Sequence, residues 1–243
     1  MTATPAYDAP VDQLLKLGDP GGFREPWPNY PAMGITREQI PGLIRMASDM
    51  ALIEAPVESR KYWAPLHAAR ALGELRAAEG VEVLIALIPY TYDDDTLGED
   101  LPAVFGLIGA PALPALTAFL ADDEQDEMAR VCAAHAFIFI ASFYPDTTQR
   151  CATILFKQLM RYEQHPEAVN TFLVGYLIDL GYTPAESLIR LVYKFGAIDE
   201  EMYGSVEEAI ALLHDAKLRE DTLPQEVEWY GFLREYLPAE PSA

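Results

Sequence analysis

The chain has 243 residues, 51% of them hydrophobic and 23% charged, which is enough apolar sequence to bury a continuous core in one or two domains. Its 38 acidic and 17 basic residues give a formal net charge of −21. Such a charge repels phosphate backbones and anionic lipids, so we expect no nucleic acid and no membrane among its partners. A basic protein would be attracted, although solubility alone is an alternative reason for the acidity.

Residues 1–35 are predicted to be irregular, because six prolines and four glycines interrupt them. Val11 to Leu17 is the one short helix expected there. We expect Trp27 and Tyr30 to pack over the first helices as an N-terminal cap, the alternative being a disordered arm. The segment shows no basic stretch followed by an apolar core, so no signal peptide is predicted and a cytoplasmic location is expected.

From residue 36 the apolar spacing predicts pairs of helices. Thr36 and Gln39 form a capping-box pattern at the first start, and Pro111 and Pro184 occupy positions where first helical turns tolerate proline. The five pairs are expected at 37–53 with 60–78, 81–89 with 97–108, 111–121 with 127–143, 147–163 with 167–180, and 184–196 with 203–214. An aromatic-rich closing helix is expected at 224–237, within a C-terminal segment of residues 215–243.

A sequence pattern repeats within this region. The run Ala-Ala-Arg-Ala-Leu-Gly at 68–73 is followed by Val-Phe-Gly-Leu-Ile-Gly at 104–109 and Ala-Ala-His-Ala-Phe at 133–137. The equivalent Leu or Phe residues are 72, 105 and 137, and a looser fourth copy places Leu177 at the same point. A period of this size built on helix pairs predicts an all-α fold, an α-solenoid of about five hairpins over residues 36–214.

These residues resemble HEAT repeats, especially the short variety named after phycobilisome lyases. The resemblance covers roughly 60–145 well and 146–214 more loosely. The runs at 40–46, 63–68 and 100–102 are also similar to uncharacterised bacterial HEAT-like proteins, some of which carry a C-terminal Cys/His metal motif. Residues 152–243 contain no cysteine, so no such motif is present. The fold class hosts unrelated functions, so the resemblance implies the fold more than the activity.

Enzymatic chemistry finds little support in the sequence. Some HEAT-like proteins are di-iron hydroxylases with His-Glu pairs, but none of the four histidines here precedes a glutamate. A DNA glycosylase would need a basic groove. No phosphate-binding glycine loop and no nucleophile elbow occurs. Cys132 and Cys151 are expected as free thiols. We therefore expect no catalytic residues, no metal site and no cofactor, and the enzyme question leans towards no.

The acids are unevenly distributed, because no Lys or Arg occurs between Arg76 and Arg130. Most acids of this stretch fall in turns between the helices of a pair, and stacked turns would place them along one edge, which we call the acidic rim. Helix N-capping is the alternative explanation for them, and calcium binding is a lesser one. The rim residues expected to bind a partner are Asp93, Asp94, Asp95, Glu99, Asp100, Asp122, Asp123, Glu124, Asp126 and Glu127.

The second helices of such pairs are expected to line a concave face. In the first pair the exposed stripe should be Trp63, His67, Arg70 and Glu74, and His135 is expected on the equivalent face of the third pair. Aromatic and charged groups mixed in this way are typical of protein interfaces.

We therefore expect a non-enzymatic scaffold or adaptor that binds a basic protein through its concave face and acidic rim. One alternative is a lyase or chaperone subunit that acts on a protein-bound chromophore. Another is an immunity-type inhibitor of a basic toxin.

Overall fold

The computed structural model describes residues 7–21, 25–92, 95–223 and 226–238. Every regular element within these ranges is a helix, which confirms the predicted all-α class. The α-helices are α1 (Ile40–Ala47), α2 (Met50–Ile53), α3 (Ala64–Glu74), α4 (Val81–Leu87), α5 (Asp95–Ile108), α6 (Leu113–Ala121), α7 (Glu127–Phe143), α8 (Thr148–Leu159), α9 (Glu167–Asp179), α10 (Glu186–Lys194), α11 (Glu200–Tyr203), α12 (Val206–His214), α13 (Ala216–Thr222) and α14 (Glu226–Trp229).

Short 3-10 helices precede or extend many of these elements. They are η1 (Val11–Lys16), η2 (Pro31–Met33), η3 (Arg37–Gln39), η4 (Arg60–Trp63), η5 (Ala78–Gly80), η6 (Ile88–Tyr92), η7 (Ala110–Ala112), η8 (Pro145–Thr147), η9 (Tyr162–Gln164), η10 (Thr183–Ala185) and η11 (Gly231–Tyr236).

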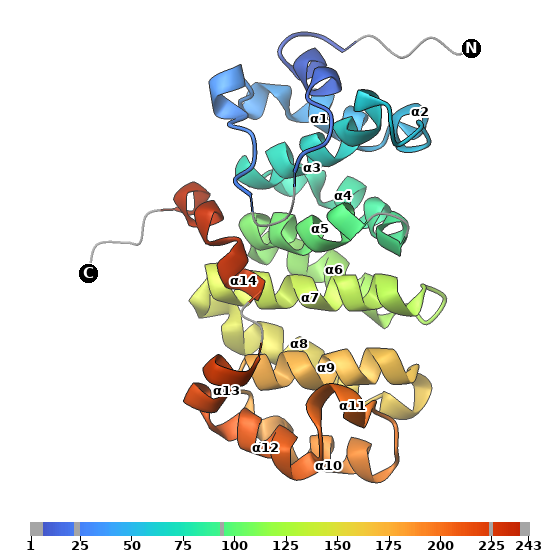
Figure 1. The fold of residues 1–243 in the computed structure, drawn as a ribbon, viewed down its shortest axis with the longest axis vertical. Coiled ribbons are helices and arrows are strands. Elements are labelled where there is room, and N and C mark those ends of the chain that lie inside the picture. The colour runs from blue at the N-terminus through green and yellow to red at the C-terminus, as the bar shows by residue number, and fades with distance from the viewer. Residues whose placement is uncertain (1–6, 22–24, 93–94, 224–225, 239–243) are drawn as a thin grey trace.

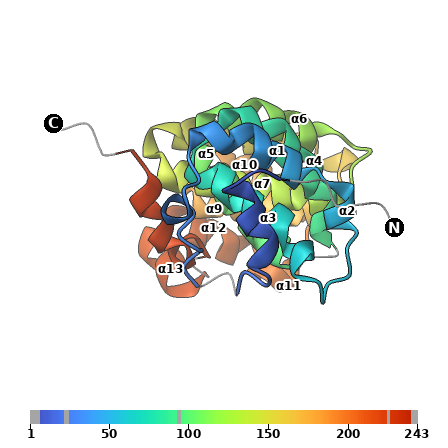
Figure 2. The same ribbon diagram turned by 90° about the horizontal axis from the view of Figure 1, so that it is seen from above.

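The helices form two layers along the length of the molecule (Figure 1). In one layer α3 packs on α5, α5 on α7, and α7 on α9. In the other, α1 contacts α4, α4 contacts α6, and α6 contacts α8. Figure 2, which looks along the row, shows α4 and α6 towards one side and α3 and α13 towards the other. We call the surface of α3, α5, α7 and α9 that faces away from α4, α6 and α8 the inner face.

Small residues allow the helices of this layer to approach closely. Every residue of α3 is buried, and the helix is rich in alanine. A Cβ atom added to Gly73 would lie 3.2 Å from the Cα of Val104 in α5. One added to Gly106 would lie 2.7 Å from the Cβ of Phe139 in α7. A side chain at 106 would therefore force α5 and α7 to shift, and one at 73 would press tightly on α5, so the small residues of the repeat pattern have a direct structural cause.

Each segment predicted for the five pairs contains a helix, although several are divided by local capping. The predicted helix at 127–143 matches α7, whose first N–H groups are capped by the Asp126 side chain. The predicted helix at 37–53 is divided into η3, α1 and α2. Asp49 has an extended backbone, and its side chain accepts a hydrogen bond from the Ala51 N–H, so it begins a new helix instead of continuing α1.

The prediction of one closing helix at 224–237 is wrong. The described part of this segment forms only α14 and η11, and the preceding polar helix α13 was not predicted at all. Instead of covering the last helix pair, the segment returns along the inner face, so that Tyr230 reaches Asp100 of α5. Figure 1 shows α14 in front of the row, beside α7.

The N-terminal segment covers more of the molecule than a terminal cap would. Helix η1 packs on α3 and η4, and the Val11 side chain fills the space beside Gly42 of α1. Beyond η1 the chain crosses in front of α3 (Figure 1), and Trp27 and Tyr30 become buried against the inner face. The two aromatic residues predicted to form the cap are thus packed as expected, but they cover the inner face of α3.

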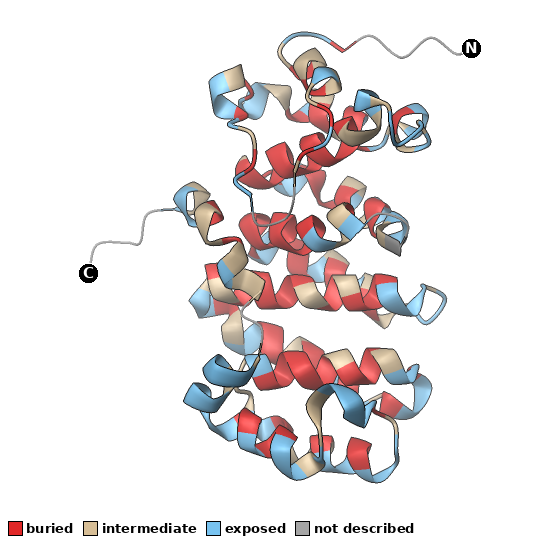
Figure 3. Ribbon diagram, viewed as in Figure 1, coloured by how far each residue is buried: buried red, intermediate tan, exposed pale blue. Residues whose placement is uncertain are grey.

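Buried residues follow the central helices, and exposed residues gather at the turns and on α13 (Figure 3). Within the described ranges, no single helix has the length and apolar character needed to cross a membrane. Only α5 and the segment 110–121 together meet that test, and they are bent by 111° relative to each other.

Candidate binding site on the inner face

A buried ion pair joins α3 and α5 at the inner face. The Arg70 Nε donates a hydrogen bond of 2.6 Å to Asp100 Oδ2, and both side chains are fully buried. The Tyr230 hydroxyl donates to Asp100 Oδ1 at 3.0 Å, and Arg70 Nη1 donates to the carbonyl of Pro20 at 3.2 Å. The indole ring of Trp27 lies 5.0 Å from the guanidinium carbon. A single charged pair thus binds both terminal segments.

His67 provides a second contact to the N-terminal segment, one turn before Arg70. Its Nε2 lies 2.8 Å from the carbonyl of Gly18, which can only accept, so Nε2 carries the proton. The Tyr30 hydroxyl, 2.8 Å away, then donates to Nδ1. Burial is the main cause that lowers the pKa of His67 to about 4, so the imidazole is neutral near pH 7.

Glu74 lies at the end of α3 and is also buried. Burial raises its pKa to about 8, an effect that the Tyr236 hydroxyl opposes and the nearby Glu235 carboxylate increases. The carboxyl group is therefore mostly protonated at pH 7 and lies beneath the C-terminal segment.

These contacts correct the prediction of an exposed stripe on the first helix pair. His67, Arg70 and Glu74 share a face as predicted, but they are buried, as is Asp100. Trp63 keeps partial exposure and packs edge-on against Tyr62, with ring centroids 5.0 Å apart. The physical reason is that the chain's own terminal segments cover this part of the inner face.

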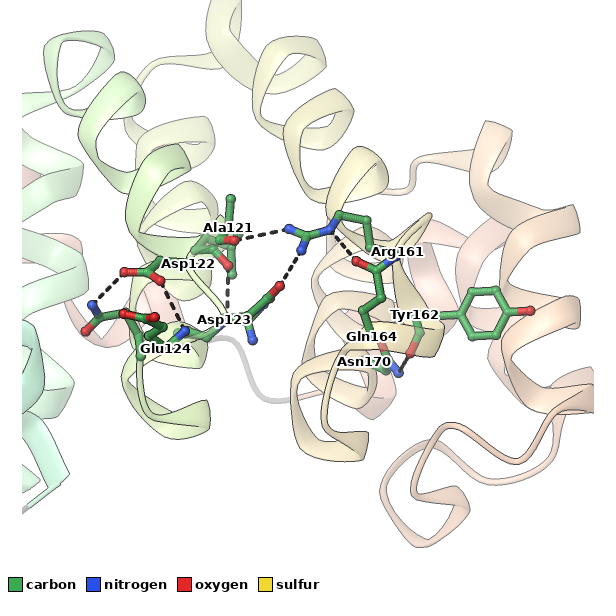
Figure 4. Close-up of polar contacts among 11 residues, drawn as sticks. Ala121, Asp122, Asp123, Glu124, Arg161, Tyr162, Gln164 and Asn170 are labelled. Atoms are coloured by element: carbon green, nitrogen blue, oxygen red, sulfur yellow. Dashed lines mark hydrogen bonds and ion pairs between the residues drawn. The ribbon is translucent and has the colours of Figure 1, made fainter.

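The acids at the turn between α6 and α7 have local roles (Figure 4). Asp122 accepts hydrogen bonds from the Glu124 N–H and from Gln125 Nε2. Asp126 accepts from Met128 N and Ala129 N at the start of α7. Asp126 therefore does what the capping alternative predicted, whereas Asp122 stabilises the turn itself. Glu124 and Glu127 remain exposed.

Asp123 bridges two helix pairs. One of its oxygens lies 3.1 Å from Arg130 Nη2, and the other lies 2.5 Å from Arg161 Nη2. Arg161 also donates to the carbonyl of Ala121 (Figure 4). Since Arg130 is buried, Asp123 compensates its charge, and this rim acid acts within the fold.

The remaining predicted rim residues are divided between two situations. Asp95 and Glu99 lie exposed on α5. Asp93 and Asp94 lie outside the described residues. Figure 1 shows the turns that precede α3, α7 and α9 on the same side of the molecule, so exposed acids of these turns share one edge.

The inner face is open farther along the row, where a cavity of about 890 Å³ lies between α7, α9, α11, α13 and α14. Its wall combines aromatic, apolar and acidic side chains. They include His135, Phe172, Tyr176, Asp179, Met202, Tyr203, Arg219, Leu223, Glu226 and Glu228.

His135, a predicted partner-binding residue, lies in the wall of this cavity. Its ring stacks on Tyr176 with centroids 5.3 Å apart, and its Nε2 lies 3.1 Å from a Glu226 carboxylate oxygen. The hydrogen bond from His135 is the main cause that lowers the pKa of Glu226. His135 thus connects α7 to α14 and fixes one carboxylate of the wall.

Asp179 occupies the same cavity in a different environment. Its side chain is exposed to the cavity. The protein around it still removes part of its hydration, and this desolvation raises the pKa of Asp179 to about 6. Glu226 contributes to the rise, while His135 and Arg219 oppose it. Arg219 itself donates through Nη1 to the carbonyls of Leu212 and Leu213 at 2.8 and 2.9 Å. Asp179 is consequently mostly ionised at pH 7.

Asp179 and Phe172 were not predicted from the sequence, although both lie at positions that the repeat register indicates. Relative to Leu72, His67 lies five residues earlier, Arg70 lies two residues earlier and Glu74 lies two residues later. The same offsets from Leu177 give Phe172, Gly175 and Asp179. Tyr203, Arg219 and Glu226 had no such signal, since they come from segments outside the repeat pattern.

Within the described ranges, no cluster of three metal-ligating side chains occurs. No family model, curated protein or solved structure matches the chain.

Proposed function

We propose that the protein is a non-enzymatic scaffold that binds a basic segment of a partner protein on its inner face. The observation that carries this proposal is the acidic and aromatic cavity at the open half of that face. Asp179, Glu226 and Glu228 contribute carboxylates to its wall, while Arg219 donates to backbone carbonyls of α12. A cationic segment complements such a surface.

The covered half of the same face supports a peptide as the ligand. There the inner helices bind the chain's own N-terminal segment through backbone carbonyls, those of Gly18 and Pro20, and through aromatic side chains. A surface that binds an irregular segment of its own chain at one end has suitable chemistry for a second segment at the other.

We further propose that the two layers of packed helices form an α-solenoid of about five HEAT-like hairpins. The repeat pattern of the sequence and the α3–α5–α7–α9 row both support this arrangement. In such an arrangement the exposed rim acids Asp95, Glu99, Glu124 and Glu127 would attract the partner at long range, while the inner face holds it.

Binding of short labelled peptides, measured by fluorescence anisotropy, tests this function. A peptide of alternating lysine and alanine should bind, and the same peptide with glutamate at each lysine should not. The affinity for the lysine peptide should fall as salt rises, because the attraction is between charges. Equal binding of both peptides, or an affinity insensitive to salt, would refute the proposal.

A further inference from the structure

The covered half of the inner face holds a cation in a defined environment. The guanidinium of Arg70 contacts the Asp100 carboxylate at 2.6 Å and has the Trp27 ring 5.0 Å away on another side. The Tyr230 hydroxyl completes the contacts of that carboxylate. An inner-helix aspartate and aromatic rings from the terminal segments thus surround one positive charge.

The cavity in the open half assembles the same chemical groups. Asp179 is its inner-helix aspartate, on α9. Tyr176 and Phe172 of α9 and Tyr203 of α11 supply aromatic rings, and Met202 and Leu223 supply apolar surface. Aromatic faces attract cations, and apolar walls accommodate the methylene chain of a lysine or arginine side chain.

Asp179 differs from Glu226 and Glu228 of the wall by its contacts, and from the fourth carboxylate, Glu220 of α13, by lying on the inner helix α9. Glu226 is hydrogen-bonded to His135, and Glu228 lies 3.1 Å from Arg234 Nη2. In the part of the chain that the structure describes, the Asp179 carboxylate has neither a hydrogen bond nor an ion pair. It is therefore the carboxylate best placed to receive a cation from outside the molecule.

We propose that this cavity binds one lysine or arginine side chain of the partner protein, with Asp179 as its counter-ion and Tyr176 and Tyr203 as its aromatic walls. This inference rests on the proposed function and names the group that the partner inserts. Because the cavity holds about 890 Å³, it has room for the whole side chain and the adjacent backbone.

The test is a double-mutant cycle measured by calorimetry. The probes are the lysine–alanine peptide and a version in which every lysine is replaced by uncharged acetyl-lysine. The proteins are the wild type, Asp179→Asn and the control Glu82→Gln, which removes one exposed charge from α4, in the layer behind the inner face. We expect Asp179→Asn to weaken binding of the lysine peptide about tenfold, whereas Glu82→Gln should change it less than about twofold.

Acetylation should weaken binding to the wild type more than binding to Asp179→Asn, since it also removes the cation that Asp179 pairs with in the wild type. Equal effects of Asp179→Asn and Glu82→Gln would overturn the inference while leaving the proposed function intact. Failure of the wild type to bind the lysine peptide would overturn both. A third probe is n-butylamine, which carries the same charged group as a lysine side chain. If n-butylamine binds to the wild type but not to Asp179→Asn, and the peptide does not bind, the assignment to a partner protein is wrong and the cavity is a site for small amines.

Discussion

The two halves of the inner face carry related side chains, but only one half is covered by the terminal segments of the chain. Around α3 and α5, the terminal segments bury His67, Arg70 and Asp100. Around α7 and α9, His135 and Asp179 line a cavity that stays open. A helix face with aspartate and aromatic residues is therefore covered by the chain itself in one place and left open in another. Which of the two occurs depends on where the termini lie.

The largest effect should come from breaking the covered half at Asp100. Asp100→Ala leaves the buried guanidinium of Arg70 without its carboxylate and removes the acceptor of the Tyr230 hydroxyl. We expect the free energy of unfolding to fall by about 3–5 kcal/mol, measured by urea denaturation. Glu124→Gln, on an exposed turn, serves as the control and should change it by less than about 0.5 kcal/mol. A loss below about 1 kcal/mol for Asp100→Ala would contradict the central role of the pair.

The second-largest effect should be on how the stability of the protein depends on pH, through Glu74 in the covered half. The pKa of Glu74 is raised from 4.5 to about 8, so the folded protein retains a proton that the unfolded chain loses. Stability therefore falls as pH rises from about 4.5 to about 8. Glu74→Gln should remove this component and stabilise the protein at pH 8 by about 2–4 kcal/mol, measured by unfolding at pH 5 and pH 8. Parallel pH profiles for the two proteins would contradict the assigned burial.

Gly175→Ala tests the packing that shapes the open half. A Cβ at this position of α9 would lie closer to the Tyr203 hydroxyl than any real contact permits, so Tyr203 would have to move. We expect a loss of about 1–3 kcal/mol in unfolding free energy and weaker binding of the lysine peptide. Unchanged stability together with unchanged affinity would show that Tyr203 does not depend on this glycine.

The smallest effect on stability should come from Asp179→Asn. The pKa of Asp179 is raised to about 6, so above that pH its ionised form opposes folding. The Asn variant should be as stable as the wild type, or more stable by up to about 1 kcal/mol, in thermal unfolding at pH 8. A clear loss of stability would instead assign Asp179 a structural role like that of Asp100.

Helical periodicity predicted most of the helices, because apolar spacing and capping residues act locally. It also placed His67, Arg70 and Glu74 on one face correctly. It could not predict that this face is buried, since the covering contacts join residues far apart, such as His67 with Gly18 and Asp100 with Tyr230. No pattern within the chain signals such pairs.

The candidate site was predicted only in part for the same reason. His135 was found because it lies within the repeat pattern, and Asp179 was within reach of that pattern. Tyr203 and Glu226 join the cavity from short polar elements whose sequences favour no particular neighbour. In the acidic turns, the sequence predicted the same binding role for every acid. Composition alone could not separate Asp123, which pairs with Arg130 and Arg161, from the exposed Glu124.

Photo-cross-linking distinguishes most directly between the two halves and the acidic rim. A lysine–alanine peptide carrying a benzophenone group would be irradiated with the wild-type protein, and the attachment sites would be mapped by mass spectrometry. We expect attachment to residues of the open cavity, chiefly Met202, Tyr203 and Leu223, with loss of this signal in Asp179→Asn. Attachment confined to the turn at Asp122–Glu127, or to residues around Arg70, would contradict it.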